Sequence, residues 1–276
     1  MKYSLKYCFL FVFLFNLQSC NSTKKQDAEA STEKIPSETE SFKDTLVYHT
    51  EQYKEFSPYF SKNDGDFDST TYTAVYPVFS SEIDSLFKPA IFVDGESTAA
   101  QVAASFLGGF NEYAEDSMDA GNNSFHTWFM DQQCHVIMNI PGFVTLKNNI
   151  STYSGGAHGI ELNLWFNYEL AERKLLAITD IVNDTTRLKE IVEIHFRKHE
   201  KLSDNETYEQ KYFFDNGQFV LADNFGLTTK GLVFHYNPYE IKSYAEGPTT
   251  ITVPYAEISG ILTPTGNTVL KNIAQK

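Results

Sequence analysis

Alternating apolar and polar residues mark a run of extended segments in the middle of the chain. The clearest segment is 160–170, where every second residue is apolar or aromatic: Leu162, Leu164, Phe166 and Tyr168. A two-residue period is typical of a strand with one buried face. Residues 125–139 and 143–153 are similar, and the links at 141–142 and 154–159 are rich in glycine and other turn residues. The pattern predicts three neighbouring antiparallel strands.

A helical period appears in two other places. Residues 97–114 carry apolar side chains at helical spacing behind a capping serine or threonine, and residues 187–199 show a similar stripe. A shorter helix is expected over 81–87. Further extended runs are expected over 46–56, 70–79, 218–222, 231–236 and 249–253, with a helical turn over 255–262.

The order of these elements predicts the fold class. Strands and helices are segregated rather than alternating, which indicates an α+β fold. We expect a small N-terminal α+β subdomain over 42–120. It would pack on a C-terminal domain over 121–276 that is mainly antiparallel sheet with one or two helices.

The N-terminus has the features of an exported lipoprotein. Lys2 and Lys6 precede an apolar run over 7–17 that is too short to span a bilayer, so residues 1–19 are expected to be a cleaved signal peptide. The sequence before Cys20 fits a lipobox, which predicts a lipid on that cysteine. The alternative is an ordinary secretory signal that happens to contain a cysteine. Residues 20–41 read as the lipidated cysteine and a disordered tether.

Localisation follows from the residues around that cysteine. Asn21, rather than aspartate, follows Cys20. We therefore expect an exported protein anchored by lipid to the outer membrane, on its periplasmic face or at the cell surface, if the source is Gram-negative.

The net charge limits the classes of ligand that the protein is expected to bind. The formal net charge is −14, which argues against nucleic acid and anionic lipid as ligands. It favours a cationic partner, although acidity also promotes solubility.

The cysteines predict no disulfide in the folded part. Cys8 falls in the signal peptide, so Cys134 is the one cysteine expected in the folded part, as a small core residue.

The first candidate site is the glycine-rich link between two predicted strands, YSGGAHG. Its members are Tyr153, Gly155, Gly156, His158 and Gly159. Glycines suit a turn with positive φ or a close backbone approach. His158 could serve as a ligand, a proton donor or a hinge contact. The structural interpretation, that it bonds backbone carbonyls and fixes the loop, is preferred from spacing alone.

The second candidate site is the segment 231–247, GLVFHYNPYEIKSYAEG, which contains Tyr239 and Tyr244. Phenol rings offer flat apolar faces with a polar edge, so they could line a glycan-binding surface. Alternatively, they buttress a corner by bonding to backbone.

Together, the YSGGAHG loop and the 231–247 segment with the following ITVPY resemble the C-terminal domain of the RsiV-like extracellular family. That family includes lysozyme-sensing anti-sigma ectodomains and accessory domains of PdaC-type peptidoglycan deacetylases. The resemblance covers about residues 42–262 and implies an extracytoplasmic sensor or accessory module. The chain shows neither a cytoplasmic anti-sigma segment nor the zinc motifs of a deacetylase domain.

One pair of histidines resembles part of a zinc-binding motif but lacks the rest of it. His195 and His199 are four residues apart on a predicted helix and could share a face. The zincin motif needs glutamate directly after the first histidine, and here Phe196 stands in that position. We therefore predict no metal site and no cofactor.

The sequence thus favours a non-enzymatic binding or sensor-type ectodomain of the cell envelope. Its ligand would be a lysozyme-like cationic protein or peptidoglycan glycan. The competing interpretation is a cell-wall carbohydrate-modifying enzyme with His158 as acid or base beside a carboxylate such as Asp180. A third is an assembly lipoprotein, whose mark would be a large exposed apolar patch.

Overall fold

The computed structural model describes residues 45–63, 66–80, 82–122, 124–203 and 205–275. The predicted signal peptide, Cys20 and the tether lie outside the described residues. Within the described ranges, no helix has both the length and the apolar character needed to cross a bilayer.

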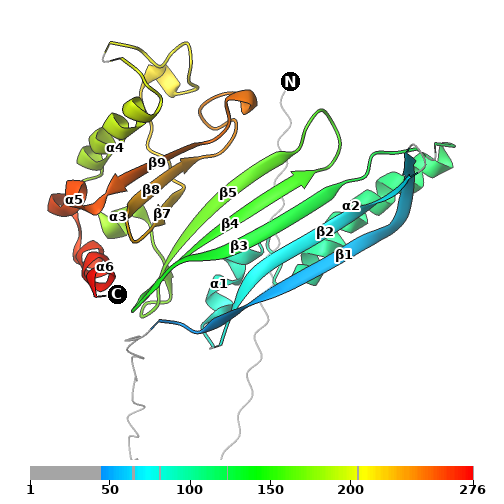
Figure 1. The fold of residues 1–276 in the computed structure, drawn as a ribbon, viewed down its shortest axis with the longest axis horizontal. Coiled ribbons are helices and arrows are strands. Elements are labelled where there is room, and N and C mark those ends of the chain that lie inside the picture. Colours follow the sequence, from blue (N-terminus) through cyan, green and yellow to red (C-terminus); the bar gives the residue numbers. More distant parts are fainter. Residues whose placement is uncertain (1–44, 64–65, 81, 123, 204, 276) are drawn as a thin grey trace, which may run out of the picture. The chain divides into compact units, whose positions relative to one another are not determined.

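A six-stranded sheet forms the larger layer of the fold (Figure 1). Its strands, which lie side by side in chain order, are β1 (Tyr48–Asn63), β2 (Asp66–Phe79), β3 (Phe129–Ile140), β4 (Phe143–Tyr153), β5 (Ile160–Glu169) and β6 (Lys174–Leu175). The pairs β3–β4 and β4–β5 are antiparallel, which confirms the three neighbouring strands predicted from alternation. The β2–β3 pair is parallel.

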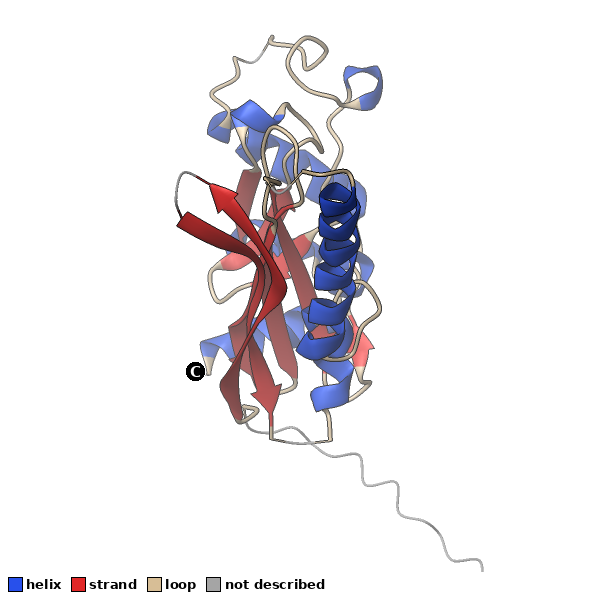
Figure 2. Ribbon diagram, turned by 90° about the vertical axis from the view of Figure 1, so that its right-hand side faces the viewer, coloured by secondary structure: helices blue, strands red, loops and turns tan. Residues whose placement is uncertain are grey.

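The parallel pair requires a crossover, and two helices supply it. These are α1 (Asp84–Ile91) and α2 (Ala99–Asp119), which carries the expected Thr98 cap and is longer than the predicted 97–114. Figure 2 shows the long helix alongside the strands. The helices and sheet enclose a core that includes Tyr72, Phe87 and Cys134. Burial raises the pKa of the Cys134 thiol to about 12, so it stays protonated at neutral pH.

A second, three-stranded sheet and its helices form the C-terminal part. Its strands are β7 (Phe225–Leu227), β8 (Gly231–Tyr236) and β9 (Thr249–Pro254). The accompanying helices are α3 (Ile178–Ile181), α4 (Thr185–His199), α5 (Tyr255–Ile258) and α6 (Pro264–Ala274), with 3₁₀ turns at Asp215–Gly217, Tyr244–Glu246 and Ser259–Ile261. The buried face of α4 packs into one core with all three strands.

These elements confirm the α+β class and correct two details. The expected strand at 218–222 is absent from the described structure, and β7 lies a few residues later. Helix α6 was not predicted. The division into 42–120 and 121–276 stays a prediction, and β2 before that boundary pairs with β3 after it.

Asparagine side chains join the two sheets along β5. The Asn167 amide donates to the Phe225 carbonyl at 2.8 Å and accepts from the Leu227 N–H at 2.7 Å. Asn224 accepts from the Trp165 N–H at 2.9 Å and donates to the Asn163 carbonyl at 2.7 Å. These amides supply the partners that a neighbouring strand would otherwise offer. The same junction brings the loop after β8 beside the loop between β4 and β5, because Asn237 accepts from the Asn163 N–H near the start of β5.

Candidate functional site

The two sequence motifs meet at the ends of those loops. His158, from the β4–β5 loop, stacks on Tyr244, with ring centroids 3.9 Å apart and planes 15° apart. The Tyr239 ring lies 5.7 Å from that of Tyr244. We call His158, Tyr239 and Tyr244 the ring cluster.

Both nitrogens of His158 have partners. Nδ1 lies 2.8 Å from the Gly159 carbonyl, so it must carry the proton and donate. The Tyr239 hydroxyl lies 3.2 Å from Nε2 and can therefore donate to it. The carbonyl contact is the loop-fixing bond expected from the sequence, and the tyrosine contact extends it to a second loop.

The glycine-rich loop has the backbone that its composition predicts. Gly155 and Gly156 have φ of 98° and 90°, a region that other residues avoid. A Cβ on Gly159 would lie 2.6 Å from the Thr152 carbonyl oxygen. The Tyr153 hydroxyl donates to the Gly156 carbonyl at 3.1 Å. These features shape the turn that presents the imidazole.

Tyr239 adopts an unusual backbone conformation. Its φ is 71°, and its side chain is 51% exposed. The Glu240 N–H donates to the Asn237 carbonyl at 3.2 Å, so Pro238 and Tyr239 are the central residues of a turn. Positive φ after a proline is usually taken by glycine. Asn237 also accepts from the Asn163 N–H at 2.7 Å, which ties the turn to β5.

A buried ion pair holds the loop that carries Tyr239 and Tyr244. Lys242 Nζ lies 2.9 Å from Glu200 Oε1, and both side chains are largely buried. Thr249 and Tyr212 donate to the same carboxylate at 3.0 and 2.9 Å. Burial raises the pKa of Glu200, but the hydrogen bonds from Lys242, Tyr212 and Thr249 outweigh it, so the pKa is lowered. The pair joins the end of α4 to the segment between Tyr239 and Tyr244.

An apolar pocket with an acidic rim adjoins the ring cluster. The pocket has a volume of about 370 Å³ and lies between residues 213–224 and 236–241. Phe213 and Val220 at this pocket are more than half exposed. Three lining carboxylates, Asp215, Asp223 and Glu240, form no ion pair with any other residue that the structure describes. We call this the acidic pocket; its lining residues Glu240 and Ile241 belong to the same loop as Tyr239 and Tyr244.

The histidine pair on α4, His195 and His199, lies near α5 and β9. His195 Nε2 lies 2.8 Å from Glu257 Oε2. His199 lines a shallow hollow with His195, Lys198 and residues 250–252 of β9. In the described ranges, no group of three or more histidine, cysteine or acidic side chains is arranged to hold a metal ion.

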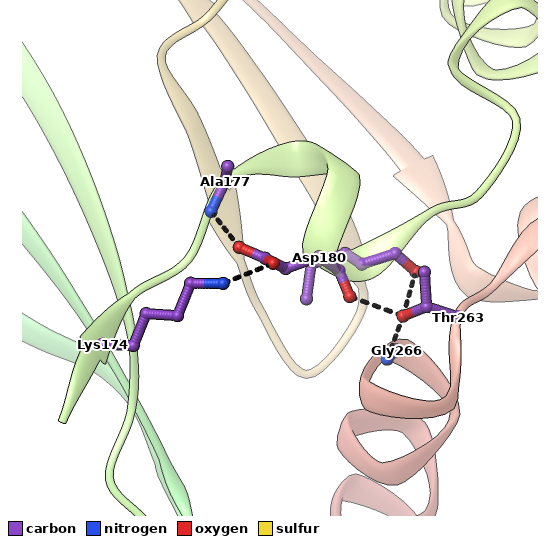
Figure 3. A network of polar contacts seen from close by, with 6 residues as sticks. Lys174, Ala177, Asp180, Thr263 and Gly266 are labelled. Carbon is purple, nitrogen blue, oxygen red and sulfur yellow. Dashed lines mark hydrogen bonds and ion pairs between the residues drawn. The ribbon is translucent and has the colours of Figure 1, made fainter. Parts of the chain in front are cut away.

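Asp180 has a structural role (Figure 3). Its carboxylate accepts from Lys174 Nζ at 2.6 Å and from the Ala177 N–H at 2.8 Å, which lowers its pKa. Its carbonyl accepts from the Thr263 hydroxyl, which also accepts from the Gly266 N–H at 3.0 Å. Asp180 therefore caps α3 and ties it to α6, and none of its described partners belongs to the ring cluster.

The residues that surround the ring cluster carry no recognisable signal in the sequence. Lys242 lies between the two tyrosines, but its partner Glu200 is distant in sequence. The acidic pocket is built from two segments that the sequence shows only as a polar stretch and a turn. Their proximity depends on tertiary contacts, such as the 2.8 Å bond from the Phe213 N–H to the Ile241 carbonyl.

Comparison with known proteins finds a family model that matches part of the C-terminal region. The model for DUF3298, a protein family of unknown function, matches residues 179–256. A crystal structure of a DUF3298 member from Bacteroides fragilis is 22% identical, with a TM-score of 0.68, covering 85% of this chain and 99% of its own. A DUF3298 structure from Pseudomonas aeruginosa is 16% identical, with a TM-score of 0.59, covering 81% and 97%. A search of curated proteins finds no match.

These matches support a DUF3298 domain in the C-terminal region and a fold like that of solved DUF3298 proteins. The finer resemblance to RsiV-like and PdaC-type proteins stays a prediction. The chain therefore carries a DUF3298 domain over residues 179–256 and is similar in fold to solved members of that family.

Proposed function

We propose that this protein is a cell-envelope lipoprotein, anchored through Cys20, whose folded part is a non-enzymatic binding module for a cationic, lysozyme-like protein. The observation that carries the proposal is the ring cluster. Two loops distant in sequence meet there to present stacked rings beside an acidic pocket. Residues 1–44 lie outside the described structure, so the anchor rests on the sequence alone.

Charge supports a cationic ligand. The net charge is −14, and the acidic pocket combines an apolar floor with three carboxylates that lack a described ion-pair partner. A lysine or arginine side chain suits such a pocket because its aliphatic stem contacts apolar surface while its charge meets the carboxylates. Complementary charge also accelerates encounter and makes it sensitive to salt.

The exposed tyrosine supports recognition rather than packing. Tyrosine is enriched among the residues that contribute most to protein interfaces. Tyr239 remains half exposed in a backbone conformation that suits glycine better. Strained positions of this kind cluster at functional sites.

The contacts of His158 favour binding over catalysis. An acid–base residue needs a free nitrogen near its substrate and a group that tunes its protonation. Here the described hydrogen-bonding partners of the imidazole are the Gly159 carbonyl and the Tyr239 hydroxyl. The carboxylate considered for an enzyme, Asp180, bonds Lys174 and Ala177 instead.

Calorimetric titration of the purified protein with lysozyme at low salt tests the proposed ligand. We expect a Kd in the micromolar range or tighter that weakens as salt is added. The triple variant Asp215→Asn/Asp223→Asn/Glu240→Gln should bind more weakly. Glu112→Gln/Asp116→Asn/Asp119→Asn on α2 makes the same change in net charge and should bind like the wild type. Absence of lysozyme binding overturns the proposal. Binding of soluble peptidoglycan fragments that the acidic-pocket variant loses and the α2 control keeps would instead assign the site to glycan.

The anchor is tested separately. Expressed in a Gram-negative host, the protein should fractionate with outer membranes and carry acyl chains. Cys20→Ala should appear in the soluble periplasmic fraction. A Cys20→Ala variant that remains with the membrane contradicts the lipid anchor.

A further inference from the structure

A polar groove crosses the outer face of β3, β4 and β5. Its volume is about 470 Å³, and Ile137 is its one aliphatic lining residue. The remaining lining side chains are Asp131, Gln133, His135, Lys147, Asn149, Ser151 and Glu161. They face the side of the sheet opposite to Cys134 and Leu146, which lie in the core with α1 and α2.

The strand register arranges these side chains in rows. Asp131 pairs with Ser151, which pairs with Glu161 on β5. The next row along the strands is Gln133 with Asn149. Rows on one face repeat every two residues, or about 6.6 Å, and neighbouring strands are about 4.8 Å apart. The groove is thus a regular ladder of polar groups rather than a single point site.

Aromatic rings stand at both ends of the ladder. At one end Phe129 stacks on its cross-strand partner Tyr153, with centroids 6.1 Å apart and planes 23° apart. Phe129 is 42% exposed. At the other end Trp165 pairs with Lys147, whose ammonium lies 5.7 Å from the ring centre. The distance between the two ends is about 20 Å by strand geometry.

Several polar atoms in and under the groove lack partners. The hydroxyl of Ser151 and the carboxylate of Glu161 have no hydrogen-bonding partner among the described residues. Trp165 Nε1 and His235 Nε2 are buried and also unpartnered within the described structure. His235 is 4% exposed and lies close enough to Lys147 and Glu161 to be affected by their charges. Of these groups, the Ser151 hydroxyl and the Glu161 carboxylate line the groove and can bond a ligand that enters it.

The chemistry of the lining identifies the class of ligand. Amides, carboxylates, a hydroxyl and an ammonium offer donors and acceptors together, and one cation offsets part of the charge of two anions. Such a surface suits an uncharged ligand with many hydroxyl or amide groups. At one end the partly exposed Phe129, stacked on Tyr153, suits the apolar face of a sugar ring. The volume is within the range of small-ligand sites.

We propose that this groove is a second binding site, specific for an uncharged oligosaccharide of several sugar units with amide substituents. This inference is independent of the protein ligand proposed for the ring cluster. A single chain would then contact a glycan through the sheet and a protein through the loops.

The test is a calorimetric titration with tetra-N-acetylchitotetraose, with a sulfated oligosaccharide of similar length as the charged comparison. The wild type should bind the neutral glycan in preference to the sulfated one. Phe129→Ala/Gln133→Ala should weaken binding about tenfold or more. Phe60→Ala/Gln52→Ala on β1 removes the same residue types from another exposed strand and should leave the affinity unchanged.

A second measurement does not depend on the folding of variants. Amide chemical shifts of the wild type should move at 131–135, 147–151 and 161 when the glycan is added. Absence of binding, equal losses in both double variants, or shifts confined to other strands overturns the groove assignment. The groove variant should bind lysozyme like the wild type, so failure here is distinguishable from failure of the proposed function. A groove variant that loses lysozyme instead assigns the face to the protein ligand and also contradicts the inference.

Discussion

The imidazole of His158 stacks on the phenol ring of Tyr244 with centroids 3.9 Å apart, although the two residues lie on loops of different sheets. The Tyr239 hydroxyl bonds the same imidazole. The larger sheet supplies the histidine and the smaller one the tyrosines, and asparagine amides along β5 hold the sheets together. The ring cluster is therefore a product of the inter-sheet junction and not of either motif alone.

Replacing Tyr239 by glycine should increase the stability of the protein and weaken its binding of lysozyme. Its φ of 71° is unfavourable for a residue with a Cβ. Tyr239→Gly should raise the free energy of unfolding by about 0.5–1 kcal/mol, since the relief exceeds the added freedom of the unfolded chain. The same variant should bind lysozyme more weakly. Urea denaturation and calorimetry measure the two effects.

Lys201 provides the matched control for that prediction. It also has positive φ, at 55°, but lies at the end of α4. Lys201→Gly should be stabilised to a similar extent with unchanged affinity. A loss of affinity in both variants would show that the effect comes from the backbone and not from the tyrosine.

The buried ion pair should contribute strongly to stability. Lys242→Met leaves Glu200 buried without its counter-charge, which should cost about 3–5 kcal/mol of unfolding free energy. The exposed pair Arg187–Glu190 is the control, and Arg187→Met should change stability by about 1 kcal/mol or less. Similar losses in the two variants, measured by urea denaturation, would contradict the structural role of Lys242.

Acid should remove the contribution of Glu200. Its pKa in the folded protein is lowered from 4.5, so its stabilising effect is present above that value and is lost as pH falls through the folded pKa. The difference in unfolding free energy between the wild type and Glu200→Gln should therefore shrink as the pH falls from neutral through the folded pKa of Glu200. A difference that stays constant across this range argues against a charged Glu200 in the folded state.

Gly226 is required by the packing of the two sheets. A Cβ at this position would lie 2.0 Å from the Trp165 ring. Gly226→Ala should destabilise the protein by about 1–3 kcal/mol through overpacking. Gly108→Ala in α2 meets nothing within 4 Å and should instead stabilise by about 0.5–1 kcal/mol. Thermal denaturation of both variants should show shifts of opposite sign, and a neutral Gly226→Ala would contradict the close approach.

The sequence predicts those parts of the structure that depend on local pattern. Alternation identified β3, β4 and β5, and helical spacing identified α2 and α4. Helix α6 also has a local signal, since Thr263 caps the helix and Pro264 occupies its first turn. The apolar run at 218–222 is packed as coil, and Tyr236 donates to the Val220 carbonyl at 2.6 Å.

The candidate site was predictable only in its separate pieces. Glycines around His158 and the tyrosines of 231–247 are visible in the sequence, but their stacking depends on Asn224 and Asn237 bonding β5. The Glu200–Lys242 pair and the polar rows of the groove arise from register and tertiary contact. Such relationships carry no local signature, because each partner alone resembles an ordinary surface residue.

The ring cluster is proposed as a recognition surface, and a single titration tests this claim. Lysozyme is titrated into wild type, Tyr244→Ala and Tyr113→Ala, the last removing a stacked, partly exposed tyrosine from α2. We predict that Tyr244→Ala weakens binding about tenfold or more, while Tyr113→Ala binds like the wild type. Wild-type affinity in Tyr244→Ala, or equal losses in both variants, would contradict the claim.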